Sequence, residues 1–210
     1  MDRRQNAGAA GKAGGVTMGM LYFTGGVLGT LNGLLSAGLA YGKGWRRKGT
    51  GAAAALGAVF GCYEIWICGA LNRDFWGMLL LSGALLSASL TDLDSREINP
   101  RSMAVYAVAL LAYQASGMSL PVCINALLGA AAGALILGLP HLLRPAAIGG
   151  GDVLLLAVCG LAAGFPGVIY VLARGLAAMA LVSVVQLARK KVTVHSEMPL
   201  APFLLFGALI

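Results

Sequence analysis

The sequence predicts an all-α protein, a polytopic transmembrane helix bundle with about eight membrane segments. Of its 210 residues, 59% are hydrophobic and only 11% are charged, whereas about a quarter of the residues of a soluble domain are charged. The mean hydropathy is +0.82, so the apolar surface is too large to be buried in one soluble core. The apolar residues also form long runs, and about 20 such residues suffice to span a bilayer.

The N-terminal segment 1–15 is polar and rich in Gly and Ala. We expect it to form a flexible tail ahead of one membrane-embedded domain, 16–210. The apolar run 16–41 follows basic residues, as in a signal peptide, but it is longer than the usual apolar region of about 7–15 residues. We therefore expect a first transmembrane helix here, with a re-entrant hairpin as the alternative.

Seven further apolar runs are expected to form membrane helices: 51–71, 75–90, 103–117, 120–143, 153–164, 168–188 and 200–210. Several of these runs are short, which indicates that some helices are tilted or only partly embedded. Small residues recur at a spacing of four, as at Gly129 and Gly133. Such residues would let a neighbouring helix backbone approach closely.

Lys and Arg concentrate in alternate connections between these runs. Segments 42–50, 92–102, 141–151 and 189–199 are basic, whereas the intervening connections contribute only Arg73. Because cytoplasmic loops are enriched in Lys and Arg, we assign the basic connections to the cytoplasm, which places the N-terminus of an eight-helix chain outside. This distribution explains the net charge of +7 without nucleic-acid binding, since no aromatic stripe accompanies the basic clusters.

All four cysteines lie within apolar runs, and none forms a CxxC pair: Cys62, Cys68, Cys123 and Cys159. Zinc sites and secreted disulfide frameworks depend on such spacings. The sequence therefore predicts buried free thiols, and it assigns no metal ligands.

Two of the eight acidic residues, Asp92 and Asp152, lie at the ends of apolar runs on the side assigned to the cytoplasm. Two neighbouring carboxylates share a proton, because like charges at close range do not both ionise easily. One carboxylate then acts as a base that activates water, and the other acts as an acid that polarises a scissile carbonyl. The simpler interpretation of Asp152 is a helix N-cap.

Three consecutive glycines, Gly149, Gly150 and Gly151, directly precede Asp152. Glycine adopts positive φ at little cost and allows another backbone to come close. We expect both properties here, and we expect the glycines to lie beside an extended substrate peptide.

Three stretches of the sequence resemble motifs of the type IV prepilin peptidases, which are membrane aspartyl proteases of the GxGD type. The stretch 92–98, DLDSREI, matches the first aspartate and the apolar residues around it. The stretch 148–153, IGGGDV, matches the GxGD box, and its aspartate follows the first by 60 residues. The stretch 197–208, EMPLAPFLLFGA, matches the family's terminal run. The resemblance extends from about residue 75 to the end of the sequence.

This resemblance implies that Asp92 and Asp152 are the catalytic pair and that Asp94 is auxiliary. It implies cleavage of the basic leader of type IV prepilin-like precursors, just before their apolar helix. The reaction would take place at the cytoplasmic face of a prokaryotic plasma membrane, and the family needs no metal or other cofactor for it. The paired cysteines associated with pilin N-methylation in larger relatives are absent from the sequence. We therefore predict a short-form peptidase without methyltransferase activity.

Two positions depart from the family pattern. Asn99-Pro100 reverses the usual order of proline followed by Asn or Asp, and Leu154 stands where the family commonly has Lys. A catalytically impaired pilus-assembly membrane protein is therefore one alternative function.

Two further alternatives come from the acidic residues. In a small ion-coupled transporter or channel, Glu64, Asp92 and Asp152 would line an ion path, but transport carboxylates are expected near the membrane midplane. Glu64 lies within an apolar run, where it is either functional or hydrogen-bonded inside the bundle. A presenilin-like protease shares the GxGD box, but its first aspartate follows Tyr, whereas Thr91 precedes Asp92.

Overall fold

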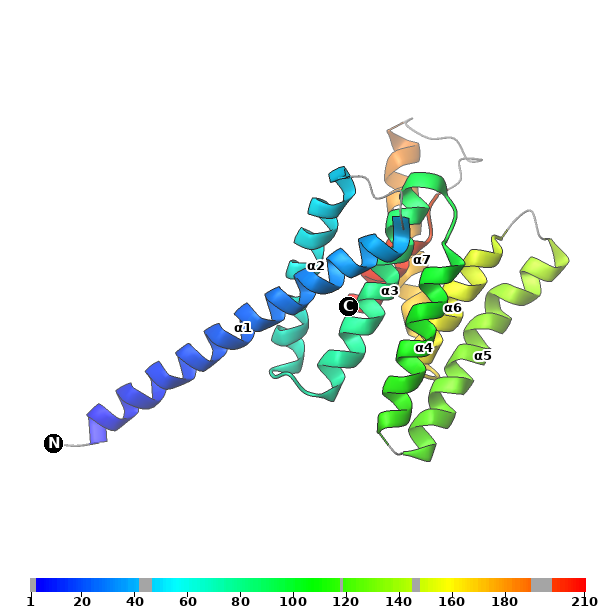
Figure 1. Cartoon of the computed structure of the whole chain (residues 1–210). Coiled ribbons are helices and arrows are strands. Elements are labelled where there is room, and N and C mark those ends of the chain that lie inside the picture. The colour runs from blue at the N-terminus through cyan, green and yellow to red at the C-terminus, as the bar shows by residue number, and fades with distance from the viewer. Residues whose placement is uncertain (1–2, 42–46, 118, 145–147, 190–197) are drawn as a thin grey trace.

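The computed structural model describes residues 3–41, 47–117, 119–144, 148–189 and 198–210. In these residues every regular element is an α-helix (Figure 1). The helices are α1 Arg3–Tyr41, α2 Arg47–Cys68, α3 Arg73–Ser95, α4 Pro100–Ser116, α5 Leu120–Leu143, α6 Gly150–Ala163, α7 Gly167–Ala188 and α8 Ala201–Leu209. Each predicted apolar run coincides with one helix, so the predicted all-α fold is confirmed.

Five of these helices, α1, α2, α3, α5 and α7, are long and apolar enough to cross a membrane. The other three are shorter: α4 has 17 residues, α6 has 14 and α8 has 9. At a rise of about 1.5 Å per residue, α6 and α8 are too short to cross the hydrocarbon core, which is about 30 Å thick. The prediction of a polytopic membrane bundle is confirmed, and its segments differ in length as expected.

The first helix differs from the prediction at its start. Helix α1 begins at Arg3, so it includes most of the segment that we expected to form a flexible tail. Residues 16–41 continue as one unbroken helix, so the alternative of a re-entrant hairpin is wrong.

Two pairs of helices approach closely at glycines. A Cβ atom on Gly29 of α1 would collide with the carbonyl oxygen of Gly57 in α2, and the reverse holds for Gly57. In the same way, a Cβ atom on Gly129 of α5 would collide with the carbonyl oxygen of Gly160 in α6. A Cβ atom on Gly133 would meet the backbone of Leu156 in α6. The small residues therefore allow backbone-to-backbone packing, as predicted for α5.

Helix α3 lies at the centre of the bundle and contacts α1, α2, α4, α6 and α8. Its second half is buried continuously from Ser82 to Ser89. The surrounding core consists of apolar side chains such as Met103, Leu155 and Leu204. Because interiors of this kind are closely packed, the core fixes the end of α3 that carries Asp92.

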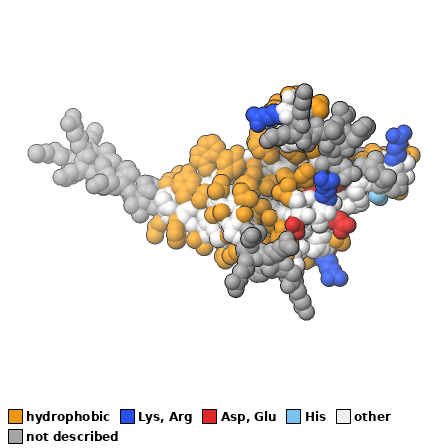
Figure 2. All heavy atoms as spheres, turned by 90° about the horizontal axis from the view of Figure 1, so that it is seen from above, with side chains coloured by type: hydrophobic (Ala, Val, Ile, Leu, Met, Phe, Trp, Pro, Cys, Tyr) orange, Lys and Arg blue, Asp and Glu red, His pale blue; other side chains and the backbone are white. Residues whose placement is uncertain are grey.

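The helix ends that carry the two aspartates lie on the same side of the bundle. The end of α3 and the start of α6 are both at the top of Figure 1, together with the ends of α1, α5 and α7 and the starts of α2 and α4. Viewed from this side, charged side chains of both signs gather beside a broad hydrophobic surface (Figure 2). The helices therefore alternate in direction, and the helix ends that flank the basic connections lie on one side of the bundle, as predicted.

Candidate active site

Asp92 lies in the last turn of α3 and is 7% exposed. Its Oδ2 accepts a hydrogen bond of 2.9 Å from the backbone N–H of Ala201, the first residue of α8. The N-terminus of a helix carries a partial positive charge. The Asp92 carboxylate therefore meets a backbone donor and a partial positive charge at this helix end.

Asp152 lies in the first turn of α6, ahead of the apolar part of that short helix, and is partly exposed. The N-cap of α6 is Gly149, so Asp152 is not the cap residue. Burial raises the pKa of Asp152, the nearby charge of Asp92 raises it further, and a backbone hydrogen bond from Gly149 opposes both effects. Asp152 therefore keeps its proton to a higher pH than an ordinary aspartate does.

The two aspartates line one cavity of about 280 Å³. Its other lining residues come from the end of α3, the connection to α4 and the glycine triplet: Arg96, Glu97, Ile98, Gly149, Gly150 and Gly151. Asp92 and Asp152 are also close enough for one to shift the pKa of the other. The fold thus brings together two carboxylates from distant parts of the sequence in a cavity that water can enter.

The glycine triplet allows a neighbouring residue to come close to its backbone, but its glycines do not have positive φ. Gly149 has a φ of −68°, and Gly150 and Gly151 already belong to α6. The prediction of a positive φ at this triplet is therefore wrong, because two of its three glycines are in helical conformation. A Cβ atom on Gly151 would lie 2.9 Å from Cβ of Ile98, so this position has no room for a side chain.

Gly149 and Gly150 are exposed, and a Cβ atom on either would meet nothing closer than 3.5 Å. Their backbone is therefore open to a ligand in the cavity. The carbonyl oxygen of Ile148, just before them, lies 2.6 Å from Nδ1 of His141 in the last turn of α5. His141 thus holds the end of the connection that leads into α6. The sequence did not predict this contact of His141, because a contact with a backbone carbonyl leaves no pattern in the sequence.

The reversed Asn99-Pro100 pair has a structural explanation. Asn99 is the N-cap of α4, its Oδ1 accepts a hydrogen bond from the N–H of Arg101, and Pro100 is the first helical residue. Asn at the N-cap and Pro at the next position are both favourable. The Asn99 side chain also donates to the carbonyl oxygens of Leu39 and Ala40 at the end of α1, at 3.2 and 3.3 Å.

The remaining residues named from the sequence lie outside the cavity. Asp94 is exposed on the last turn of α3 and does not line the cavity. Leu154 packs against the core. Glu64 is fully buried in the last turns of α2, on the opposite side of the bundle, and neither carboxylate oxygen has a hydrogen-bond partner among the described residues. Glu197, at the start of the third motif, lies outside the described residues.

This geometry does not favour a transporter. Asp92 and Asp152 lie near helix ends on one side of the bundle, and Glu64 lies toward the other side. A path lined by all three carboxylates would require them near one another at the midplane.

A comparison with protein-family models matches residues 78–184 to the type IV leader peptidase family. The match covers 107 of the 210 residues and includes both aspartates and the glycine triplet. No curated protein and no solved structure matches the chain. The chain therefore belongs to the type IV leader peptidase family.

Proposed function

We propose that this protein is a membrane aspartic endopeptidase that cleaves the basic leader peptide of type IV prepilin-like precursors at the cytoplasmic face. The observation that carries the proposal is the cavity in which Asp92, Asp152 and the glycine triplet meet. Membership of the leader peptidase family supports peptide cleavage in general. The Lys and Arg residues near this end of the bundle support the cytoplasmic orientation.

The different surroundings of the two carboxylates suggest their roles. Asp92 accepts the Ala201 N–H hydrogen bond at a helix N-terminus, and in its ionised form it removes a proton from the attacking water. Asp152, whose pKa is raised, donates its proton to the carbonyl oxygen of the scissile peptide. The tetrahedral intermediate then collapses: the proton held by Asp92 passes to the leaving nitrogen, and a hydroxyl proton of the intermediate returns to Asp152, which restores both carboxyl groups to their starting forms.

The exposed backbone of Gly149 and Gly150 supports binding of an extended peptide beside the two carboxylates. Glu97 lies on the wall of the same cavity and offers a negative charge to the basic leader, as Asp94 does from the adjacent surface. A leader bound in this way places the following apolar helix of the precursor next to the membrane-embedded helices.

The test is cleavage of a prepilin-type peptide, with a basic leader and an apolar helix, by purified protein in detergent. We expect Asp92→Asn and Asp152→Asn each to lower the cleavage rate by at least about 100-fold, the usual contribution of one acid or base. Ser116→Ala, an exposed position in the last turn of α4 on the opposite side of the bundle, is the control and should cleave normally. Full activity of both single variants would overturn the proposal.

One observation favours a second candidate, a catalytically impaired membrane protein of pilus assembly. Leu154 packs against the core at the position where the family commonly has Lys, so the candidate site lacks a cation two residues after Asp152. Under this alternative, folded wild-type protein does not cleave the peptide, and Leu154→Lys restores cleavage.

A further inference from the structure

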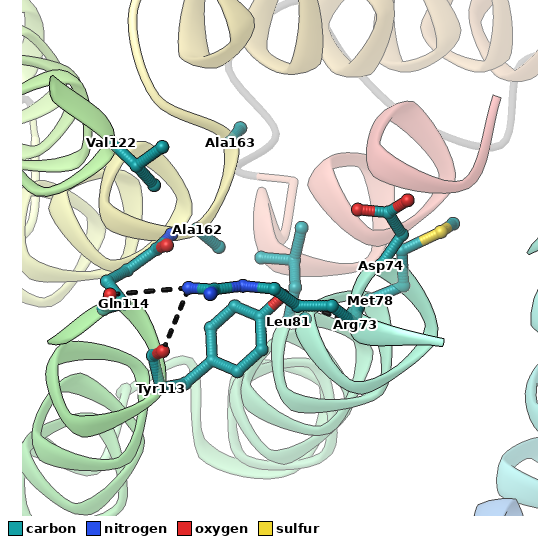
Figure 3. A pocket seen from close by; sticks show the side chains of 10 residues that line it. Arg73, Asp74, Met78, Leu81, Tyr113, Gln114, Val122, Ala162 and Ala163 are labelled. Carbon is teal, nitrogen blue, oxygen red and sulfur yellow. Dashed lines mark hydrogen bonds between the residues drawn. The ribbon is translucent and has the colours of Figure 1, made fainter. Parts of the chain in front are cut away.

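A second cavity, of about 500 Å³, is shown in Figure 3. It lies at the end of the bundle opposite the aspartates (Figure 1). It is formed by the start of α3, the end of α4, the start of α5 and the end of α6. Its polar lining is Arg73, Asp74, Tyr113 and Gln114, and its apolar lining includes Met78 and Leu81. The leader peptidase chemistry makes no use of this cavity.

Among the described residues, the Arg73 guanidinium group is held by backbone carbonyls and an aromatic ring and not by a carboxylate. Its Nη2 donates hydrogen bonds to the carbonyl oxygens of Tyr113 and Gln114, at 3.2 and 3.3 Å. It also lies 5.0 Å from the centre of the Tyr113 ring. The guanidinium also packs against Gly117. Arg73 is exposed, and its Nε and Nη1 groups donate to no residue that the structure describes, so they can donate to a ligand in the cavity.

Asp74 places a negative charge at the same cavity but does not pair with Arg73. The carboxylate points away from the guanidinium, which is directed toward Tyr113 and Gln114 (Figure 3). Asp74 is exposed, and no hydrogen bond or ion pair joins its side chain to the described part of the chain. The cavity therefore offers a positive group and a negative group at separate positions.

Exposed aromatic residues place this cavity at the level of the lipid headgroups. Trp66 at the end of α2 is 67% exposed, Trp76 at the start of α3 is 43% exposed, and Tyr170 at the start of α7 is 58% exposed. These three helix ends lie on the same side of the bundle as the cavity (Figure 1). Trp and Tyr are enriched at membrane–water interfaces.

We propose that this cavity binds a phospholipid whose headgroup carries both a phosphate and a primary amine. Arg73 binds the phosphate, as guanidinium groups do through charge-assisted hydrogen bonds, and Asp74 accepts hydrogen bonds from the ammonium group. The acyl chains leave along Met78, Leu81 and the neighbouring apolar residues toward the bilayer. A soluble zwitterion would satisfy the two charges but would leave these apolar residues unused.

The test is native mass spectrometry of the delipidated full chain in detergent, with added dioleoyl phosphatidylethanolamine or dioleoyl phosphatidylglycerol. We expect Asp74→Asn to lower the retention of phosphatidylethanolamine about tenfold, the effect of losing one hydrogen bond between charged groups. Retention of phosphatidylglycerol, which has no amine, should not fall. Asp74→Glu should restore phosphatidylethanolamine retention, and Asp94→Asn, an exposed acid at the other end, should have no effect.

Two outcomes would overturn the proposal. One is unchanged retention of phosphatidylethanolamine by Asp74→Asn. The other is displacement of the bound lipid by an equal concentration of glycerophosphoethanolamine, because a headgroup without chains would then bind as well as the lipid.

Discussion

The carboxylates of Asp92 and Asp152 belong to helices that end and begin at the same cavity, yet their surroundings differ. Asp92 is 7% exposed and accepts a hydrogen bond from the first N–H of α8. Asp152 is more exposed, but burial and the charge of Asp92 both raise its pKa. This asymmetry is the physical basis for assigning one of them as base and the other as acid.

The raised pKa of Asp152 predicts how stability changes with pH. The folded protein holds this proton to a higher pH than the unfolded chain does. The resulting stability is fully present below the pKa of an unfolded aspartate, about 3.9, and is lost as the pH rises through the folded pKa. We therefore expect Asp152→Asn, which stays neutral, to melt at a higher temperature than wild type near pH 7.

The measurement is thermal unfolding of both proteins in the same detergent over a range of pH. The difference between their melting temperatures should shrink as the pH falls toward about 4, where both side chains are neutral. A wild-type protein that is the more stable of the two near pH 7 would contradict the role of Asp152 as the proton holder.

Among the elements, the start of α6, which carries most of the GxGD box, and the residues just before it are held from two sides. Ile98, between α3 and α4, packs against Gly151, and His141 of α5 lies within hydrogen-bond distance of the carbonyl oxygen of Ile148. This segment is thereby tied to the helix that carries Asp92 and to the helix that precedes the segment in the chain. The relative position of the two aspartates depends on these contacts.

Gly151→Ala should disturb this arrangement. The new methyl group would lie 2.9 Å from Cβ of Ile98, and Cβ atoms do not move without their backbone. We expect a loss of stability of about 1–3 kcal/mol, typical of overpacking, and a lower rate of peptide cleavage. Thermal unfolding and the cleavage assay measure the two effects.

Gly150→Ala is the matched control, because a Cβ atom there would lie 3.8 Å from the nearest atom, Nε2 of His141. It should fold as stably as wild type. Combining Gly151→Ala with Ile98→Gly should recover part of the lost cleavage activity, since glycine lacks the Cβ atom that the new methyl group would meet. An equal loss in the single and double variants would show that the collision is not the cause.

At the scale of the whole molecule, the apolar runs predicted the number and order of the helices, because lipid-facing and buried surfaces both require apolar side chains. They did not predict where α3 ends. The run stops at Leu90, but α3 continues to Ser95 and ends where Arg96 adopts a φ of 56°. Asp92 therefore projects from a helix and not from a loop.

The sequence did not predict the backbone contacts that hold the candidate site together. The pairing of Asp92 with Asp152 follows from their place at run ends and from the family motifs. The contacts of Ala201 and His141 involve backbone N–H and C=O groups, which every residue possesses. The sequence therefore gives no signal for them, and only the packing of α8 and α5 reveals them.

The direction of the bundle in the membrane is a prediction for the molecule as a whole. The helix ends near the aspartates are the basic ones, so we expect this side to face the cytoplasm. Arg144, at the end of α5, and Ser116, in the last turn of α4, lie on opposite sides and are both exposed. In a variant whose four cysteines are replaced by alanine, Ser116→Cys in intact cells should react with a membrane-impermeant maleimide. Arg144→Cys should react only after the membrane is permeabilised, and the reverse pattern would place the candidate active site outside the cell.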